Sequence, residues 1–421
     1  MSSVTVSPSP LNGKVTLPPS KSHTMRALVL SAMAKGHSRI YNPLFSPDVD
    51  AMIQAIRGLG AECLFERDHI CVKGISGKVR PWVSSLDVGN SGIVLRFASA
   101  LYALADSPIL LSGDNSICHR RLFNPLANGL KKLGAEITFL EKEGFAPVCI
   151  HGPLFAGRCS VDGQDSQTVS ALLLSLPFLD GDSIVTVENM GETPWVEMTL
   201  AWLDRVGILV KREENSFFIP GGQKLPGFSY SVPSDMSGLA FMVAAALVTE
   251  SDVCICGIDR NQGDYKIIEH VQKMGAVVSL RGNLLYIKGP QKLRGIDLDI
   301  NETVDALPVL SILAACAEGS SRFYNGAICR NKESDRIAAM ACALSSIGIN
   351  VEEMRDGLTI YGGDLQGSTL DGKEDHRVVM ALTVAGLRKE MTICGIECTN
   401  KSFPGFFSTL QALGAHIEIV K

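Results

Sequence analysis

One pattern of apolar and polar positions recurs along the whole chain: an amphipathic helix, an apolar residue, a glycine, and then a run of β-type residues. The apolar residue and its glycine occur as Leu59-Gly60, Leu133-Gly134, Val206-Gly207, Met274-Gly275, Ile347-Gly348 and Leu413-Gly414. Successive copies are 74, 73, 68, 73 and 66 residues apart. So regular a period indicates internal repetition, and the sequence predicts six similar repeats.

The elements of each repeat follow from the same pattern. Each recurring glycine is expected to end a helix in the left-handed conformation, after which the chain turns into a strand. Strands of this kind are expected at Val277–Leu280 and Ile417–Val420. A second helix precedes the first in each repeat, as at 24–34, 93–105, 169–176 and 238–248. Because helices and strands alternate, the chain is expected to have an α/β fold.

Six repeats divide most naturally into two domains of three, with a crossover near Val232-Pro233. A single solenoid of six repeats is the alternative. The period of about 70 residues is longer than that of most solenoids, which favours two domains.

Composition narrows the class of protein. The chain has 421 residues, 20% of them charged, and a net charge of -5. There is no basic run of the kind that binds nucleic acid, and no apolar stretch approaches the roughly 18 residues of a membrane span. The 12 cysteines lack metal-binding spacing and are expected to be reduced thiols, and the first residues do not resemble a signal peptide. We therefore expect a cytoplasmic protein without a metal site.

Lysine and arginine stand repeatedly at predicted helix starts, where each is unfavourable by about 0.3–1 kcal/mol. The positions are Lys21 with Arg26, Arg96, Lys332 with Arg336, Arg377, and Lys401. A single case is usually a solvated side chain, but five together favour a cleft that binds a substrate with several negative charges. Lys332 and Arg336 are expected on one face of the helix that they open.

Two carboxylates and one histidine are candidates for chemistry. Asp305 interrupts an apolar stretch and is either a helix cap or a functional carboxylate. Glu333 lies between two cations and is expected to be ionised and well oriented. His376 alone is more typical of a structural residue.

Several motifs, in this order and spacing, resemble the EPSP synthase family of enolpyruvyltransferases over nearly the whole chain. They are Pro19-Ser20-Lys21-Ser22 with Arg26, Gly89-Asn90-Ser91-Gly92 with Arg96, Asp305-Ala306-Leu307-Pro308, Lys332-Glu333-Ser334-Asp335-Arg336, Asp375-His376-Arg377 and Lys401-Ser402-Phe403-Pro404. The resemblance implies the family's fold, an inside-out α/β barrel in each domain, with three βαβαββ repeats per domain. It implies domains at residues 1–19 plus 233–421 and at residues 20–232, with the active site in the cleft between them.

The resemblance also implies the reaction. The enolpyruvyl group of phosphoenolpyruvate would pass to the 5-hydroxyl of shikimate 3-phosphate, with release of phosphate and without a metal or organic cofactor. Both partners would be small molecules, and the protein is expected to be a monomer.

Matching the motifs residue by residue assigns roles within this sequence. The resemblance implies that phosphoenolpyruvate is bound by Lys21, Gly92, Arg120, Gln167, Arg336, Arg377 and Lys401. It implies that shikimate 3-phosphate is bound by Lys21, Ser22, Arg26, Ser166, Gln167, Asp305 and Lys332. Glu333 would protonate C3 of phosphoenolpyruvate and Asp305, beside Lys332, would take the proton of the hydroxyl, with Lys21 as the fourth catalytic residue.

The chain departs from the family pattern beside the acceptor's phosphate. Asp165 and Glu192 stand where the family usually has serine, and carboxylates there would repel a phosphate. We expect local compensation, with Arg120, Arg121 or Arg158 as counter-charges.

Three other functions are alternatives to this one. An enolpyruvyltransferase acting on UDP-N-acetylglucosamine would carry Lys-Asn in place of Lys21-Ser22, and a cysteine five residues before its arginine, whereas Cys118 precedes Arg120 by two. A non-catalytic anion-binding paralogue would not need Asp305 and Glu333. An RNA-end cyclase would need more basic surface than a net charge of -5 suggests.

Overall fold

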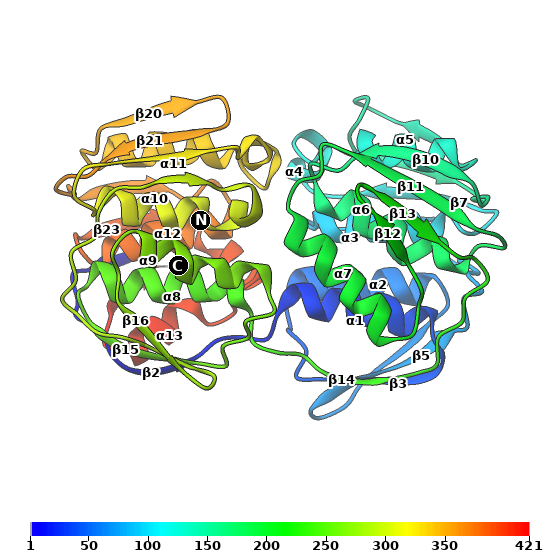
Figure 1. The fold of residues 1–421 in the computed structure, drawn as a ribbon, viewed down its shortest axis with the longest axis horizontal. Coiled ribbons are helices and arrows are strands. Elements are labelled where there is room, and N and C mark those ends of the chain that lie inside the picture. Colours follow the sequence, from blue (N-terminus) through cyan, green and yellow to red (C-terminus); the bar gives the residue numbers. More distant parts are fainter. Residues whose placement is uncertain (1, 421) are drawn as a thin grey trace. The chain divides into compact units, whose positions relative to one another are not determined.

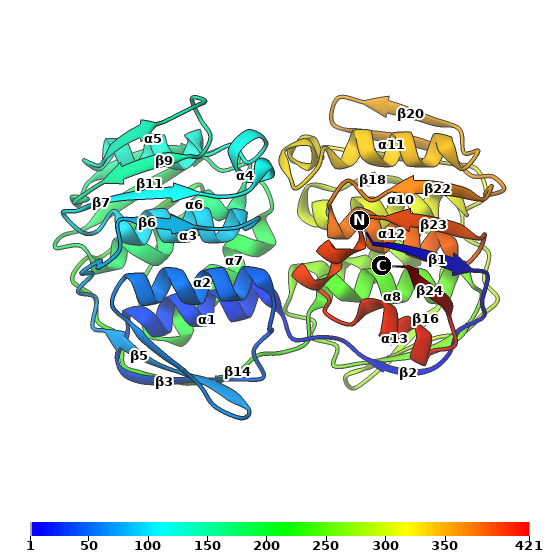
Figure 2. The ribbon, with the colours of Figure 1, turned by 180° about the vertical axis from the view of Figure 1, so that it is seen from behind.

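The computed structural model describes residues 2–420, which form two compact units. Within the described residues, unit 1 consists of 2–18 and 233–420, and unit 2 of Pro19–Val232. Each unit contains three sheets of four strands, and its helices and strands are drawn in Figure 1 and, from behind, in Figure 2.

The repeat predicted from the sequence is confirmed as βαβαββ. In unit 2 one copy runs through β6 (Ser85–Asp87), α3 (Gly92–Tyr102), β7 (Pro108–Ser112), α4 (Asn115–His119), α5 (Asn124–Lys132), β8 (Glu136–Phe139) and β9 (Val148–His151). Its sheet has the order β6-β7-β9-β8, with β6 and β7 parallel and the other pairs antiparallel. The next copy has the same order and comprises β10 (Arg158–Asp162), α6 (Ser166–Ser175), η1 (Leu176–Phe178), β11 (Ser183–Glu188), α7 (Thr193–Arg205), β12 (Lys211–Glu213) and β13 (Ser216–Ile219).

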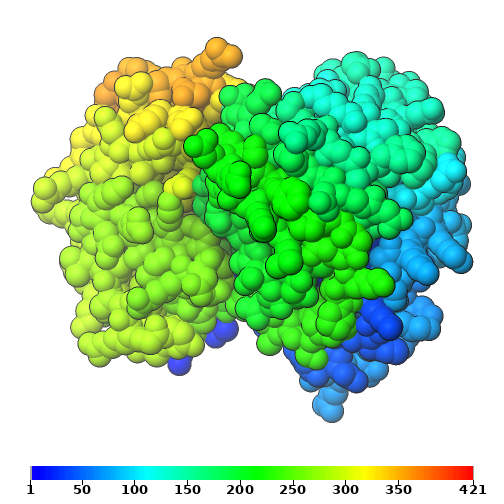
Figure 3. All heavy atoms as spheres, turned by 45° about the vertical axis from the view of Figure 1, so that its right-hand side comes forward, coloured from blue at the N-terminus to red at the C-terminus, as the bar shows by residue number. Residues whose placement is uncertain are grey.

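The remaining copy of unit 2 joins the beginning and the end of that unit. It comprises α1 (Lys21–Met33), β3 (Lys35–Tyr41), α2 (Pro47–Gly58), β4 (Glu62–Phe65), β5 (His69–Ile75) and β14 (Ser229–Ser231). Strand β14 pairs in parallel with β3 and so takes the place of the first strand of the repeat. Figure 3 shows the result at the surface, where late residues of unit 2 (green) adjoin early ones (blue).

Unit 1 is built in the same way, and two of its sheets are completed by the start of the chain. One copy is contiguous: β18 (Asp297–Asp299), η3 (Asn301–Ala306), α10 (Leu307–Ala315), β19 (Ser320–Tyr324), η4 (Ala327–Asn331), α11 (Arg336–Ser346), β20 (Val351–Met354) and β21 (Gly357–Tyr361). A second comprises β2 (Asn12–Thr16), α8 (Met236–Val248), β15 (Asp252–Cys256), η2 (Gly263–Lys266), α9 (Ile267–Lys273), β16 (Val278–Arg281) and β17 (Leu284–Ile287). The third comprises β22 (Ser368–Asp371), α12 (His376–Gly386), β23 (Met391–Cys394), η5 (Ile396–Lys401), α13 (Phe406–Ala412), β24 (His416–Val420) and β1 (Ser3–Ser7), with β1 between β23 and β24.

The first helix of each repeat forms the centre of its unit. Every residue of α8, α10 and α12 is buried, and the three helices pack against one another (Figure 2). Helices that are apolar all round belong in a core. In unit 2 the equivalent helices α1, α3 and α6 are also buried, except at Lys21, Ser22, His23 and Gln167 near their N-termini. Of the six central helices, α1 and α6 are therefore partly accessible at their N-terminal turns.

The six recurring glycines end helices as predicted. Each follows a second helix of a repeat, and their φ angles lie between 78° and 106°, where glycine is tolerated without strain. None of the helices in residues 2–420 is long and apolar enough to cross a membrane.

Two predicted helix starts are wrong. Lys401 is the last residue of η5, and the next helix, α13, begins only at Phe406. The other error concerns α11. Helix α11 begins at Arg336, because Asp335 caps it by accepting a hydrogen bond from the N–H of Ala338 at 3.0 Å. Lys332 and Glu333 therefore lie in the turn before the helix, and Lys332 does not share a helix face with Arg336.

Candidate active site

In unit 1, the N-terminal turns of four helices meet around two buried guanidinium groups. Arg336 is the first residue of α11, and Arg377 is the second residue of α12. Arg377 donates to the carbonyl oxygen of Ser237 in α8 at 3.3 Å. Its Nη2 lies 3.3 Å from a carboxylate oxygen of Asp305, two residues before α10.

Arg336 is held by three carboxylates. Its Nε is 2.8 Å from Oδ2 of Asp375, its Nη1 is 2.6 Å from Oδ1 of Asp305, and its Nη2 is 2.9 Å from Oε2 of Glu333. The side chain is only 1% exposed. Burial alone would lower the pKa of Arg336, but Asp375, Glu333 and Asp305 raise it well above its usual range. The site thus fixes a permanently charged, planar donor.

Asp305 does not cap α10, since Ala306 occupies the N-cap position of that helix. Burial works to raise its pKa, but Arg377, Arg336 and Lys332 outweigh burial and hold the pKa of Asp305 well below its usual range. Its side chain is 25% exposed. The structure therefore presents an accessible carboxylate anion among three cations.

Glu333 belongs to the same group of charged side chains and links Arg336 to Lys401. Its Oε1 is 2.8 Å from Nζ of Lys401, at the end of η5, while its Oε2 contacts Arg336. Glu333, Lys332 and Lys401 are all buried. The sequence-predicted residues of unit 1, which are Asp305, Lys332, Glu333, Arg336, Arg377 and Lys401, are thus brought together.

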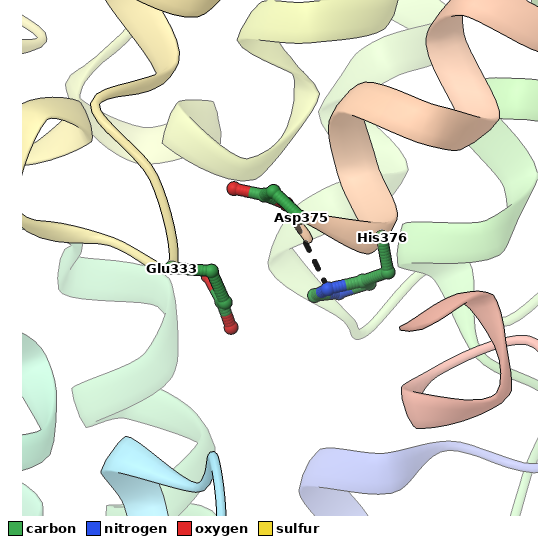
Figure 4. Close-up of side chains that lie close together, drawn as sticks. All are labelled: Glu333, Asp375 and His376. Carbon is green, nitrogen blue, oxygen red and sulfur yellow. Dashed lines mark ion pairs between the residues drawn. The ribbon is translucent and has the colours of Figure 1, made fainter. Parts of the chain in front are cut away.

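Glu333, Asp375 and His376 are close enough to be tested as a metal site (Figure 4). Their ligand atoms lie within 4.8 Å of one another, and Nδ1 of His376 is 3.7 Å from Asp375. The carboxylates, however, are already neutralised by Arg336 and Lys401. A divalent cation would have to displace these, so the residues fit an anion-binding cluster better than a metal centre.

In unit 2, Arg26 lies across α1, α6 and α7. It donates to Oγ1 of Thr199 at 2.8 Å, to the carbonyl of Trp195 at 3.0 Å and to the carbonyl of Ser22 at 3.1 Å. Burial lowers the pKa of Arg26 to about 9. Among residues 2–420 no carboxylate forms an ion pair with it, so this buried cation would gain from an anionic ligand.

Lys21 pairs with a carboxylate that the sequence analysis did not single out. Its Nζ is 3.1 Å from Oδ2 of Asp48, in the first turn of α2. The sequence signal that could have identified Asp48 is an acidic residue in the first turn of a predicted helix.

Gly92 opens α3 beside two buried arginines. A Cβ atom at this position would lie 3.0 Å from Nη1 of Arg96 and 3.4 Å from Nε of Arg121. The missing side chain therefore lets both guanidinium groups approach the start of α3.

Asp165 caps α6 and pairs with Arg96. Its Oδ1 accepts from the N–H of Gln167 at 3.0 Å, and its Oδ2 is 2.8 Å from Nη2 of Arg96. Arg96 also donates to Oε1 of Gln167 at 3.2 Å. Burial lowers the pKa of Arg96, as does Arg121, while Asp165 and Glu192 oppose this.

Glu192 also reaches the start of α6. Its Oε2 accepts from the N–H of Ser166 at 3.1 Å and from Oγ of Ser166 at 2.9 Å. The carboxylate group is buried, with the residue 2% exposed. The two unusual carboxylates thus turn toward protein donors.

Asp165 pairs with Arg96, which was not among the expected counter-charges. Of the expected ones, Arg120 and Arg158 have exposed side chains, and Arg121 is buried beside the start of α3. Arg120 is the residue after α4, beside the buried Arg121.

Asp375 is a site residue to which the sequence motifs assign no role. The available signal was an Asp directly before a basic helix start, which is typical of an N-cap. In the structure Asp375 accepts from the N–H of Arg377 at 2.9 Å and from Oγ of Ser334 at 3.0 Å, besides pairing with Arg336.

Comparisons with known proteins agree with one another. Residues 6–410 match the family model described as EPSP synthase (3-phosphoshikimate 1-carboxyvinyltransferase). A 3-phosphoshikimate 1-carboxyvinyltransferase from Methanocella arvoryzae is 39% identical, over 98% of this chain and 99% of that protein. One from Chlamydia muridarum is 37% identical, over 98% and 95%. The structure of EPSP synthase from Acinetobacter baumannii matches with a TM-score of 0.83 at 30% identity over all of both chains. The enolpyruvyl transferase NikO from Streptomyces tendae matches with a TM-score of 0.79 at 16% identity, over 100% of this chain and 98% of NikO, which shows a shared fold.

Proposed function

This chain belongs to the EPSP synthase family, and we propose that the clusters around Arg336 and Arg96 together bind the substrates of its reaction. The enzyme transfers the enolpyruvyl (carboxyvinyl) group of phosphoenolpyruvate to the 5-hydroxyl of shikimate 3-phosphate and releases phosphate, a step of the shikimate pathway. Enolpyruvyl transfer to UDP-N-acetylglucosamine is not favoured by any of the comparisons.

Phosphoenolpyruvate carries a carboxylate and a phosphate, so its binding requires several cations. The residues proposed for it are Lys21, Gly92, Arg120, Gln167, Arg336, Arg377 and Lys401. The burial of Arg336 and Arg377 at converging helix N-termini supports this assignment. Arg120 is exposed and would have to turn toward the substrate.

The acceptor is proposed to bind through Lys21, Ser22, Arg26, Ser166, Gln167, Asp305 and Lys332. Arg26 is the best supported of these, because it is a buried cation that lacks a carboxylate partner among the described residues. An acceptor carrying a phosphate would supply that negative charge.

Asp305 is the proposed base for the 5-hydroxyl, with Lys332 beside it. Its pKa lies well below the usual range while Arg377 and Arg336 contact it, so in this arrangement it is a weak base. The carboxylate of phosphoenolpyruvate would compete for the same guanidinium groups. Binding of that substrate would therefore loosen these contacts and raise the pKa of Asp305 toward the range of an effective base.

Glu333 is the proposed proton donor to C3 of phosphoenolpyruvate. Because both of its oxygens pair with cations, the Glu333 carboxylate must first take up a proton, which Nζ of Lys401, 2.8 Å from its Oε1, would supply before Glu333 passes it to C3. Arg336 and Lys401 would stabilise the negative charge on the departing phosphate, and Lys21 would do so from unit 2.

The two units are proposed to be domains, residues 1–19 plus 233–421 and residues 20–232, that close on the substrates and exclude water. We also propose that the protein is a cytoplasmic monomer, that it needs no metal or organic cofactor, and that it binds neither nucleic acid nor membranes.

The contact of Asp305 and Glu333 with the same guanidinium group, that of Arg336, is the observation that carries this proposal. Phosphorus NMR of the enzyme with both substrates tests it. We expect the phosphoenolpyruvate signal to be replaced by inorganic phosphate in step with conversion of the shikimate 3-phosphate signal to that of its 5-enolpyruvyl ether. Loss of phosphoenolpyruvate without that product would contradict the proposal.

A further inference from the structure

The N-terminus of α6 has an internal anion bound to it. Both donors of Ser166, its backbone N–H and its Oγ, point to the same carboxylate oxygen, Oε2 of Glu192, at 3.1 and 2.9 Å. Free N–H groups at the start of a helix are ordinary donors to phosphate and carboxylate. Glu192 therefore occupies the position that an oxyanion would otherwise take.

The charges around this position are balanced by the protein itself. Arg96 is 2% exposed and pairs with Asp165 at 2.8 Å, and Arg121 is buried next to it. Two carboxylates, Asp165 and Glu192, thus accompany two guanidinium groups. A phosphate dianion added to this set would bring net negative charge into a buried place, which is strongly unfavourable.

The same Ser166 is among the residues proposed to bind the acceptor's phosphate. One N–H and one O–H cannot serve Glu192 and a phosphate fully at the same time. Like charges so close also repel each other. Binding of a phosphorylated acceptor therefore requires that the Glu192 carboxylate leave Ser166.

We propose that Glu192 is a specificity-determining residue of the acceptor site, whose carboxylate competes with the acceptor's phosphate for Ser166. This inference rests on the proposed function and deepens it. It has two consequences: Glu192 weakens the binding of shikimate 3-phosphate, and it reduces the preference for that acceptor over the same alcohol without phosphate.

Steady-state kinetics of Glu192→Ala and Glu192→Gln test the proposal, because alanine removes the carboxylate and glutamine keeps its shape without the charge. We expect the KM for shikimate 3-phosphate to fall about tenfold in the alanine variant and severalfold in the glutamine variant. The KM for phosphoenolpyruvate and kcat should stay within about twofold. The ratio of kcat/KM for shikimate 3-phosphate to that for shikimate should rise in both.

Glu188→Gln is the matched control, since Glu188 is an exposed carboxylate at the end of β11 in the same unit. It removes the same charge and should leave all these values unchanged. Inhibition by inorganic phosphate, competitive with shikimate 3-phosphate, should become stronger in the Glu192 variants only.

The possible results distinguish a failure of the proposed role of Glu192 from a failure of the proposed function. An unchanged or raised KM for shikimate 3-phosphate in the Glu192 variants would overturn the proposal while leaving the function intact. Absence of turnover with shikimate 3-phosphate in the folded wild-type enzyme would overturn the proposed function instead. If the alanine variant does not fold, the glutamine variant decides.

Discussion

Asp375 and Arg336 form an ion pair that is closed to solvent: Oδ2 and Nε are 2.8 Å apart, and the side chains are 0% and 1% exposed. The same carboxylate caps α12 through the N–H of Arg377. One residue therefore sets the orientation of Arg336 and the start of the helix that carries Arg377.

Replacing Asp375 by Asn should disturb both functions at once. Hydrogen bonds to charged groups contribute about 1.5–3 kcal/mol each, so we expect the free energy of unfolding to fall by roughly that amount. The KM for phosphoenolpyruvate should rise about tenfold or more. Urea unfolding and initial rates measure these changes. Asp371→Asn, which alters an exposed carboxylate, should change neither, and an unaltered KM in Asp375→Asn would contradict the positioning role.

Asp305→Asn should reduce kcat by roughly 10²–10⁴, the usual contribution of a general base. Turnover close to wild type would remove Asp305 from the proposed chemistry. Circular dichroism should confirm that the variant is folded.

Asp305 should also contribute to the pH dependence of stability. Its folded pKa lies below the ordinary value of 3.8, so the unfolded chain takes up its proton first. The stabilisation is therefore present above about pH 4 and is lost as pH falls toward the folded pKa. The difference in unfolding free energy between wild type and Asp305→Asn should shrink below about pH 4. A difference that does not change with pH would contradict the lowered pKa.

Glu333→Gln should keep only one of the contacts to Lys401 and Arg336, because an amide has a single acceptor oxygen, and it removes the carboxylate that would carry the proton. We expect kcat to fall by roughly 10²–10⁴ and the free energy of unfolding to fall by about 1–3 kcal/mol, the cost of a buried donor left without an acceptor. Exchange of deuterium from solvent into C3 of phosphoenolpyruvate should slow in parallel. Undiminished exchange would assign the proton transfer to another group.

Gly92→Ala should weaken phosphoenolpyruvate binding. Its Cβ would lie 3.0 Å from Nη1 of Arg96, tighter than an ordinary contact, so the guanidinium group must shift. We expect a severalfold higher KM for phosphoenolpyruvate and an unchanged melting temperature. Gly157→Ala is the control, because a Cβ there meets only Leu133 at 3.9 Å. Equal effects of the two substitutions would contradict the proposed contact.

Much of the fold could be predicted from the sequence because its signals are local. The recurring glycines, the Ser20 cap of α1 and the apolar central helices are all encoded within a few residues. The completion of distant sheets by β1, β2 and β14 could not be predicted in this way. Strand partners depend on long-range pairing, which no short stretch of sequence specifies.

The candidate site could be predicted from the sequence only in part. Cations at helix starts indicated anion binding, but the carboxylates that hold them depend on which helix ends meet in space. Arg96 therefore went unrecognised as the partner of Asp165, and Asp48 as the partner of Lys21. The start of α11 was misplaced because Asp335, not the motif as a whole, determines where the helix begins.

The proposed reaction is tested most directly by the initial rate of phosphate release from phosphoenolpyruvate, with shikimate 3-phosphate and UDP-N-acetylglucosamine each offered as acceptor. We expect release with shikimate 3-phosphate alone, and its loss in Asp305→Asn. Release with UDP-N-acetylglucosamine, or none with either acceptor from folded protein, would contradict it.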